Sequence, residues 1–419
     1  MKTVRCVKGM HDILPDDMPK WHFVENTYRS LVEHFGYAEV RTPILEPLDL
    51  FVRGIGETTD IVEKEMYAFE DKGGARLALR PEGTASAIRA YIQHNVQARE
   101  PQTKWYYLGS MFRRERPAKG RYRQFYQAGA ELIGTQAPSA DAEIIDMAVQ
   151  FIESLGIDGV SVQLNTLGDE ATRPLFRAAL VEYFSKLDSE LCGDCHRRLE
   201  TNPLRILDCK KEKCGEIASR APSVHDFLSE EASAHFNELR RLLDRIKIPY
   251  RVVPQMVRGL DYYTRTIFEV QVRSDSLGAQ AAIVGGGRYD NLIHDLGGRD
   301  TPAIGFSFGI ERLLMILDGS AVPERDSGVF VAGVGEGGQD RAFSLARELR
   351  KAGLKVEITY TGGSLRSQLK RADRLGAAVT LIAGEDEAAR GAVTWRDMKD
   401  GQQEEVPLAD LVSRIEANR

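Results

Sequence analysis

The chain has 419 residues and a formal net charge of -6; 42% of its residues are hydrophobic and 28% are charged. This length predicts two or three domains of an ordinary globular enzyme. The net charge argues against a protein coated in basic residues, but it is compatible with a local basic site. No apolar run approaches the roughly 18 residues of a membrane span, residues 1–12 lack the apolar core of a signal peptide, and five cysteines are too few for a disulfide scaffold. We expect a reduced cytoplasmic enzyme with no membrane association.

The first half of the chain predicts a mixture of helices and strands. Residues 19–35 form a helix in this prediction, because Val24, Tyr28 and Leu31 recur at helical spacing and Gly36 follows. Strands are expected at residues 37–41 and 77–80, and further helices at residues 83–92 and 139–155.

Residues 173–247 differ in composition from their surroundings. They are rich in charge and helix formers and carry four of the five cysteines. They also separate two strand-forming stretches, so we expect a helical insertion within a domain that spans residues 1–322. Beyond the insertion, strands are expected at residues 250–253, 264–272 and 281–284, and a helix at residues 312–317.

The best candidate for a linker is residues 321–328, which contain Pro323 and mixed charge. After it, predicted strands alternate with amphipathic helices at residues 329–334, 340–351, 355–359, 365–374 and 379–383. This alternation indicates a parallel or mostly parallel sheet in a C-terminal α/β domain, residues 328–419.

The most informative local feature is a basic hairpin. Residues 105–115 and 121–133 alternate like strands around a turn at residues 117–120. Between Phe112 and Phe125 one anion, Glu115, stands among six cations: Arg113, Arg114, Arg116, Lys119, Arg121 and Arg123.

The second strand of the hairpin has two different faces. One face is apolar and consists of Tyr126, Ala128, Ala130 and Leu132. The other grades from cationic through aromatic to acidic and consists of Arg121, Arg123, Phe125, Gln127, Gly129 and Glu131, with Gly129 leaving space between its neighbours. Arginine forks suit a polyphosphate, an aromatic ring suits a purine, and a carboxylate suits a cationic substrate. The alternative is an edge hairpin whose charges serve solubility, but six cations against one anion favour an ATP site.

These residues resemble motif 2 of the class II aminoacyl-tRNA synthetases. The resemblance implies that Arg113 binds the α-phosphate and the substrate carboxylate, that Glu115 meets the adenine amino group, and that Phe125 stacks on the ring, with Arg121 also at the ATP. Residues 305–312 resemble motif 3, where Arg312 would reach the γ-phosphate. Residues 35–44 resemble motif 1, which in this class builds a homodimer interface.

Two more stretches resemble the histidyl-tRNA synthetase family. In residues 79–84 the resemblance implies that Glu82, Gly83 and Thr84 hold the substrate α-ammonium group. In residues 258–264 it implies that Arg258 sits against the reacting carboxylate and α-phosphate while Tyr262 and Tyr263 line the imidazole pocket. Residues 285–290, with three glycines and Tyr289, would let backbone approach the bound histidine closely. Gln127 would also contact histidine, and Glu131 and Tyr263 would read the two imidazole nitrogens.

The resemblance covers essentially the whole chain and implies both fold and reaction. The fold would be an α+β catalytic domain with a central antiparallel sheet, a small helical insertion, and a C-terminal anticodon-binding domain. The reaction would join L-histidine and ATP into histidyl-adenylate and then transfer histidine to the 3' end of tRNA(His), releasing pyrophosphate and AMP. Neither step needs a protein nucleophile. Mg²⁺ is expected with ATP, with Glu311 as a contact.

The cysteines of the insertion leave two interpretations open. Cys192, Cys195, Cys209 and Cys214 offer four thiolates to a structural zinc ion, with knuckle spacing in the first pair and looser spacing in the second. The family does not require such cysteines. The sequence alone therefore favours reduced cysteines without metal.

The C-terminal domain supplies a hypothesis from another class. Gly333, Gly335 and Gly338 follow a predicted strand and precede a helix, and Glu357 ends the next strand, as in a dinucleotide-binding oxidoreductase. A domain of about 90 residues is small for that role. The family resemblance instead makes it an anticodon-binding domain, in which Arg366, Lys370 and Arg374 share a helix face and meet either RNA phosphates or only solvent.

A third hypothesis is a binding module. A catalytically silent relative of the family serves as a regulatory subunit of ATP phosphoribosyltransferase, and it generally lacks the C-terminal domain and parts of the histidine signature. This chain keeps both, which argues against that role.

Overall fold

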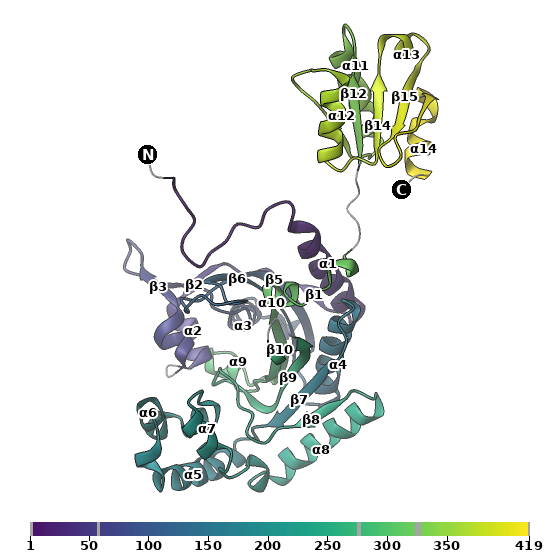
Figure 1. Cartoon of the computed structure of the whole chain (residues 1–419). Helices are drawn as coiled ribbons and strands as arrows, with labels where there is room; N and C mark the ends of the chain where they lie inside the picture. The colour runs from purple at the N-terminus through teal and green to yellow at the C-terminus, as the bar shows by residue number, and fades with distance from the viewer. Residues whose placement is uncertain (1–2, 57–58, 275–277, 323–327, 418–419) are drawn as a thin grey trace. The chain divides into compact units, whose positions relative to one another are not determined.

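The computed structural model describes residues 3–56, 59–274, 278–322 and 328–417. Its chain divides into two compact units, residues 1–322 and 323–419 (Figure 1). Residues 323–327 of the expected linker lie outside the described residues. None of the described helices is long and apolar enough to cross a membrane.

An eight-stranded sheet forms the centre of the first unit. Its strands, in spatial order, are β1 (Ala38–Glu39), β5 (Thr103–Phe112), β6 (Gln124–Ile133), β11 (Ala303–Gly309), β10 (Gly278–Arg288), β9 (Thr264–Ser274), β7 (Ser161–Thr166) and β8 (Tyr250–Val252). The six inner strands pair antiparallel, as the family resemblance implies. The outermost pair at each edge is parallel, so the complete sheet is mixed.

Helices cover one face of this sheet and build the main core. They are α1 (Met18–His34), α4 (Pro138–Ser154), α8 (Glu230–Arg245) and α10 (Ile310–Leu314). In α1 the buried side chains recur at helical spacing, and Gly36, with φ +83°, ends the element in the left-handed region. The apolar face of β6 enters the same core, where Ala128 and Ala130 are fully buried.

The opposite face of the sheet carries smaller elements. Helices α2 (Leu48–Ile55), α3 (Thr84–Gln93) and α9 (Leu292–Asp295) lie there with a three-stranded sheet of β2 (Leu45–Pro47), β4 (Arg76–Leu79) and β3 (Tyr67–Glu70). The strand expected at residues 77–80 therefore belongs to this second sheet. A separate apolar cluster joins α3 to Tyr262, Tyr263 and Tyr289.

Residues 173–247 are helical but fall into two parts. Helices α5 (Thr172–Ser185), α6 (Gly193–Thr201) and α7 (Glu212–Ala218), with the 3-10 turn η4 (Pro203–Asp208), pack around their own small core (Figure 1). Helix α8 instead packs on α4, and its Phe236 and Leu239 enter the main core. The independent part of the insertion is therefore shorter than its composition indicates.

The C-terminal unit is a five-stranded sheet with its own core. The strand order is β13 (Val356–Ile358), β12 (Val329–Gly333), β14 (Val379–Ala383), β15 (Ala392–Asp397) and β16 (Gln403–Pro407). The helices are α11 (Gly338–Lys351), α12 (Leu365–Arg374), α13 (Glu385–Ala389) and α14 (Leu411–Ala417). The first three strands are parallel as expected, but β15 and β16 add two antiparallel pairings. The expectation of a parallel or mostly parallel sheet is thus wrong for its last two strands.

Candidate active site

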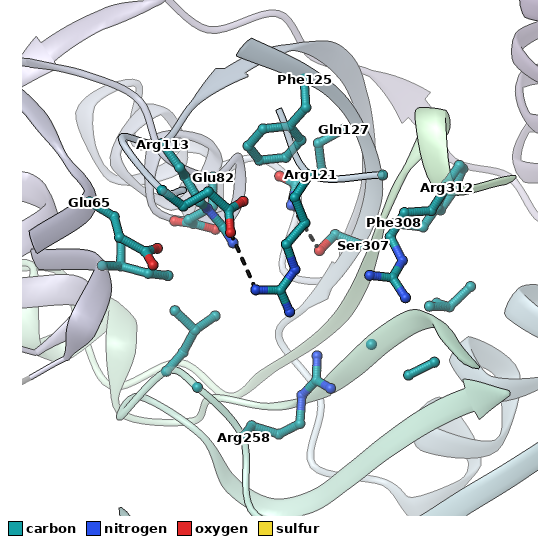
Figure 2. Close-up of a pocket in the computed structure, with 18 of the residues that line it drawn as sticks. Glu65, Glu82, Arg113, Arg121, Phe125, Gln127, Arg258, Ser307, Phe308 and Arg312 are labelled. Atoms are coloured by element: carbon teal, nitrogen blue, oxygen red, sulfur yellow. Dashed lines mark hydrogen bonds and ion pairs between the residues drawn. The ribbon is translucent and has the colours of Figure 1, made fainter. Parts of the chain in front are cut away.

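A cavity of about 410 Å³ opens on the sheet face that the main core helices leave free. Strand β6 contributes Phe125 and Gln127 to its wall, and β11 contributes Ser307. Alternation along β6 explains this placement, since the residues between them face the core. Segments far apart in the sequence thus meet at one place, which Figure 2 shows.

Five arginines line this cavity, of which Arg205 belongs to the insertion. Arg113 follows β5, Arg121 stands in the hairpin turn, Arg258 precedes β9 and Arg312 lies in the first turn of α10. Figure 2 shows the guanidinium groups of Arg121, Arg258 and Arg312 directed toward one central space. Acidic side chains such as Glu115 also line the cavity and offset part of this charge, and a bound anion would stabilise the guanidinium groups further.

Two of these arginines have an unsatisfied buried nitrogen. Among the residues that the structure describes, neither Nε of Arg258 nor Nε of Arg312 has a hydrogen-bond partner. Arg258 also forms an ion pair with Glu269 through Nη1. Burial, and secondarily the nearby Arg121, lowers the pKa of Arg312. Buried donors without acceptors cost free energy, which a bound oxyanion would recover.

One end of the cavity combines an aromatic ring with a carboxylate. The Arg113 guanidinium lies 5.2 Å from the centroid of the Phe125 ring, and its Nε donates to the Pro81 carbonyl at 2.9 Å. One face of Phe125 is therefore covered by a cation. Glu115 pairs with Arg121 across 3.4 Å.

A second group of residues builds a polar wall at the start of α3. The two Glu82 oxygens accept the backbone N–H groups of Thr84 and Ala85 at 2.8 and 2.7 Å. The Gly83 N–H donates to Gln127 Oε1 at 2.9 Å, and Gln127 Nε2 donates to Ser307 at 3.2 Å. Gln127 thereby ties this wall to β11, and Glu82 keeps lone pairs for a further donor.

Glu131 lies deeper and is buried without a cation beside it. It accepts hydrogen bonds from the Thr84 hydroxyl at 2.7 Å and from the Tyr289 hydroxyl. Burial raises the pKa of Glu131 to about 8, because these hydroxyls only partly offset the loss of water. Tyr262 packs against Tyr263 and Tyr289, with centroid separations of 4.8 and 5.6 Å, and completes an aromatic pocket.

The glycines of these segments make room for side chains of the protein itself. A Cβ on Gly285 would overlap the Arg258 guanidinium, and one on Gly305 would overlap the Glu131 carboxylate. A Cβ on Gly129 would lie 2.5 Å from the Tyr107 hydroxyl. The space that Gly129 leaves is therefore occupied by Tyr107, which corrects the expectation that this glycine leaves room between its neighbours, and Gly285 makes room for Arg258.

Tyr107 and Ser307 are site residues that the sequence interpretation missed. Tyr107 approaches Thr84 Oγ1 at 3.4 Å and pairs in register with Gly129. A signal was present, because the hairpin turn dictates which residues of the two strands face each other. Ser307 lies within the motif 3 stretch, where roles are expected from the sequence for Glu311 and Arg312 alone.

Most of the hairpin cations do not reach the cavity. Arg114, Arg116 and Lys119 are exposed outside it. Arg123, expected on the cavity face, instead turns to the N-terminal segment and donates to the Lys8 carbonyl at 3.3 Å. Of the six hairpin cations, only Arg113 and Arg121 therefore line the cavity. Arg258 and Arg312, from other segments, add further positive charge to its wall.

The remaining candidate metal ligands are Glu311 and the four cysteines of the insertion. Both Glu311 oxygens accept the Tyr126 N–H, at 2.9 and 3.1 Å, and burial raises the pKa of Glu311 to about 7. Glu311 also lines the cavity and retains lone pairs there. The four cysteines lie in the insertion and not in the cavity, and their Sγ atoms are all within 4.8 Å of one another.

In the C-terminal unit the glycines have a packing role. Gly338 opens α11, and a Cβ on Gly333 would overlap the Gly338 carbonyl, so the strand and helix meet too closely for side chains. Glu357 is exposed on β13. Arg366, Lys370 and Arg374 are exposed on α12.

Comparison with known proteins agrees with this geometry. Residues 9–313 match a family model described as histidyl-tRNA synthetase, and residues 328–418 match an anticodon binding domain. Histidine–tRNA ligases of Sorangium cellulosum (strain So ce56) and Geobacillus thermodenitrificans (strain NG80-2) are 50% and 46% identical to the chain; the matches cover 99% and 97% of the chain and 96% of each relative. The crystal structure of apo S. aureus histidyl-tRNA synthetase superposes with a TM-score of 0.84 at 37% identity, covering 99% of this chain and all of that one.

Proposed function

The chain belongs to the histidyl-tRNA synthetase family, and we propose that the cavity described above is where it joins histidine to ATP. Members of the family are ATP-dependent ligases that attach histidine to tRNA(His), and the similarity over nearly the whole chain carries that activity to it. The oxidoreductase hypothesis is therefore wrong, since the C-terminal unit matches an anticodon-binding domain. The regulatory-subunit hypothesis is also wrong, because the chain has the C-terminal domain that such a subunit generally lacks, and its curated relatives are histidine–tRNA ligases.

The observation that carries the assignment of the site is the convergence of Arg113, Arg121, Arg258 and Arg312 with Phe125 in one cavity. The triphosphate lies among the arginines in this proposal, with its α-phosphate at Arg113 and Arg258 and its γ-phosphate at Arg312. Adenine stacks on the Phe125 face that Arg113 leaves open. A phosphate that draws Arg121 away from Glu115 frees that carboxylate for the adenine amino group.

Histidine lies between the polar wall and the aromatic pocket. Glu82, Thr84 and Gln127 hold the α-ammonium end, which agrees with the carboxylate and amide oxygens found there. Glu131 accepts an imidazole N–H from the deep end of the pocket, and Tyr263 reads the other ring nitrogen. Tyr262 and Tyr289 pack around the ring and keep water out.

The chemistry then needs placement and charge, and no protein nucleophile. The histidine carboxylate attacks the α-phosphorus, the bond to the β-phosphate oxygen breaks, and pyrophosphate leaves. Arg113 and Arg258 hold the attacking carboxylate beside the α-phosphate and offset the negative charge that develops on its oxygens. The terminal ribose hydroxyl of tRNA next attacks the carbonyl of histidyl-adenylate and displaces AMP.

Magnesium accompanies ATP in synthetases of this kind. Mg²⁺ commonly takes one or two protein carboxylates and completes its shell with phosphate oxygens and water. Glu311 fits that requirement, because it is a partly buried carboxylate at the cavity wall that accepts the Tyr126 N–H and retains lone pairs for a cation. The ion would supply further neutralisation of phosphate charge.

Two other surfaces are assigned to partners. The exposed arginines and lysine on α12 meet phosphates of the tRNA anticodon region in this proposal. A homodimer forms through the motif 1 region, where Ile44 and Leu45 are exposed with Phe69 on the small sheet. As an enzyme of protein synthesis, the chain acts in the cytoplasm.

ATP–pyrophosphate exchange measured with each of the twenty amino acids tests the proposal. We expect exchange with histidine alone, because a pocket that hydrogen-bonds its ligand can reject analogues without those groups by about 10⁴–10⁵. Exchange with another amino acid would overturn the reading of the deep pocket and leave the ATP site standing. No exchange with any amino acid would overturn both.

A further inference from the structure

The four cysteines of the insertion form a cluster that the reaction does not use. Cys192 caps α6 and Cys195 lies in its first turn, while Cys209 follows η4 and Cys214 lies in α7. The turns of the chain bring the four Sγ atoms within 4.8 Å of one another. This convergence is the observation that the spacing of the cysteines alone did not supply.

The distances fit a single tetrahedral ion. Zinc–sulfur bonds of about 2.3 Å place the sulfurs of a tetrahedral site about 3.8 Å apart. Cys192 and Cys209 have their sulfurs 3.9 Å apart, and none of the four cysteines is in a disulfide. A disulfide would need a separation of about 2.05 Å, whereas a cluster of several irons would hold the thiolates further apart.

The surroundings of the cluster also favour a structural site. Cys195 and Cys214 are buried in the small core of the insertion with Phe176, Leu180 and Ile206. The backbone N–H of Cys192 donates to the Cys214 sulfur at 3.3 Å, a contact that stabilises a thiolate. The core spans only residues 176–228, a size at which apolar burial alone rarely suffices and a metal or a disulfide is a common addition.

We propose that Cys192, Cys195, Cys209 and Cys214 bind one structural zinc ion that holds α6, η4 and α7 together. Four thiolates in a closed tetrahedral arrangement select zinc among the divalent ions that a reduced protein meets. Because all four positions are protein sulfurs, the ion has no open site for substrate and serves structure only.

The zinc module also reaches the active site. Between the two cysteine pairs, Arg205 donates to the Gly259 carbonyl at 2.8 Å and pairs with Asp261 at 3.0 Å. Asn202 also donates to Asp261, at 3.1 Å. These contacts hold the loop that carries Arg258. The ion therefore positions that arginine indirectly, through Arg205 and Asn202. This consequence rests on the proposed function, whereas the metal site itself does not.

Metal analysis of the full-length, tag-free protein tests the site directly. We expect about one zinc per chain in the wild type and in Cys6→Ser, and less than about a tenth in Cys192→Ser/Cys209→Ser. Cys6 is the matched control, because it is exposed and remote from the cluster in sequence. The double variant alters the two less buried cysteines, which limits damage to the core.

Replacement of the ion by Co²⁺ in the wild type gives a second readout that needs no variant. We expect the intense visible absorption of a tetrahedral site together with thiolate-to-cobalt charge transfer. A wild type without zinc whose five thiols all react with a thiol reagent would overturn the proposal. The proposal would also be overturned by an intact mass that is lower by two hydrogens, which indicates a disulfide, or by a double variant that keeps its zinc.

Pyrophosphate exchange separates the metal site from its link to catalysis. Chelation of the zinc is expected to raise the KM for histidine several-fold, with zinc added back restoring it. If the protein contains zinc but its KM for histidine does not change on chelation, the ion does not position the loop of Arg258. The zinc site itself would still stand. A zinc-containing protein with no exchange at all would refute the proposed function instead.

Discussion

Two buried charge systems lie on opposite sides of the central sheet, and they differ in how they are satisfied. On the core side, Arg288 is fully buried and bonds to Asp141 through Nε at 3.1 Å and Nη2 at 2.5 Å. Its other nitrogen donates to the Thr135 carbonyl at 2.9 Å. On the cavity side, Arg258 and Arg312 each keep a buried Nε without an acceptor among the described residues.

The carboxylates show the same difference. Asp141 has Arg288 beside it, whereas the groups that the structure describes around Glu131 are hydroxyls, those of Thr84 and Tyr289 among them, and not cations. A charge that the protein satisfies internally contributes to the fold, and one that it leaves unsatisfied is held for a ligand. The first system should therefore respond to mutation in stability, and the second in activity.

The largest expected effect is on the core side. Arg288→Met leaves the Asp141 charge buried without a cation and should cost about 3–5 kcal/mol of stability in the first unit. Urea unfolding of the full chain measures this loss. The double variant Arg288→Met/Asp141→Leu should recover much of it, because both charges are then gone. If Arg288→Met were as stable as the wild type, the Arg288–Asp141 pair would not contribute to the fold as this comparison requires.

On the cavity side, Arg258→Ala should reduce histidine-dependent pyrophosphate exchange by about 10²–10³, because one donor to the transition state is lost. Its melting temperature should change little, because the ion pair that is lost, with Glu269, is partly exposed to solvent. Arg116→Ala is the matched control, as this arginine is exposed outside the cavity. Near-normal exchange in a folded Arg258→Ala protein would remove Arg258 from the reaction.

Much of this arrangement could be predicted from local sequence. Alternation along residues 121–133 separated core from cavity on β6, since strand geometry dictates which side chains share a face. The helix periodicity around Tyr28 predicted α1 within one residue at each end. Both features depend on neighbours in the chain, and so the sequence contains them.

What could not be predicted depends on contacts between distant segments. The sequence does not show that Gly285 makes room for Arg258, because the two meet only after β9 and β10 pair. For the same reason it does not show that Arg123 turns away to Lys8, or that four cysteines spread over residues 192–214 converge. Strand β16 was missed because its charged residues resemble a surface loop, whereas β15 was missed although Val393, Thr394 and Trp395 favour a strand.

Gly285 offers a finer test of how closely the cavity side is built. In Gly285→Ala the new Cβ overlaps the Arg258 guanidinium, which must move by roughly an ångström or more, and such a misplacement can cost about 10²-fold in rate. Stability should change little, because the end of a long side chain moves away cheaply. Exchange kinetics and urea unfolding measure the two effects. Gly319→Ala is the control, since this glycine is exposed outside the cavity and its added Cβ would meet nothing closer among the described residues than Lys20 Nζ at 3.9 Å.

The smallest expected effect is a pH dependence that only the cavity side should show. Burial holds the pKa of Glu131 at about 8, so the carboxyl is largely protonated at pH 7 and becomes an ionised acceptor for the imidazole N–H as the pH rises. The kcat/KM for histidine should therefore increase by about fivefold between pH 7 and pH 8, over a range in which the imidazole of free histidine is already mostly neutral. Glu131→Gln cannot ionise, so its profile should be flat over this range and lie below that of the wild type. A wild-type profile as flat as that of the variant would mean that the carboxyl is already ionised when histidine arrives, and that Thr84 and Tyr289 satisfy it as fully as Arg288 satisfies Asp141.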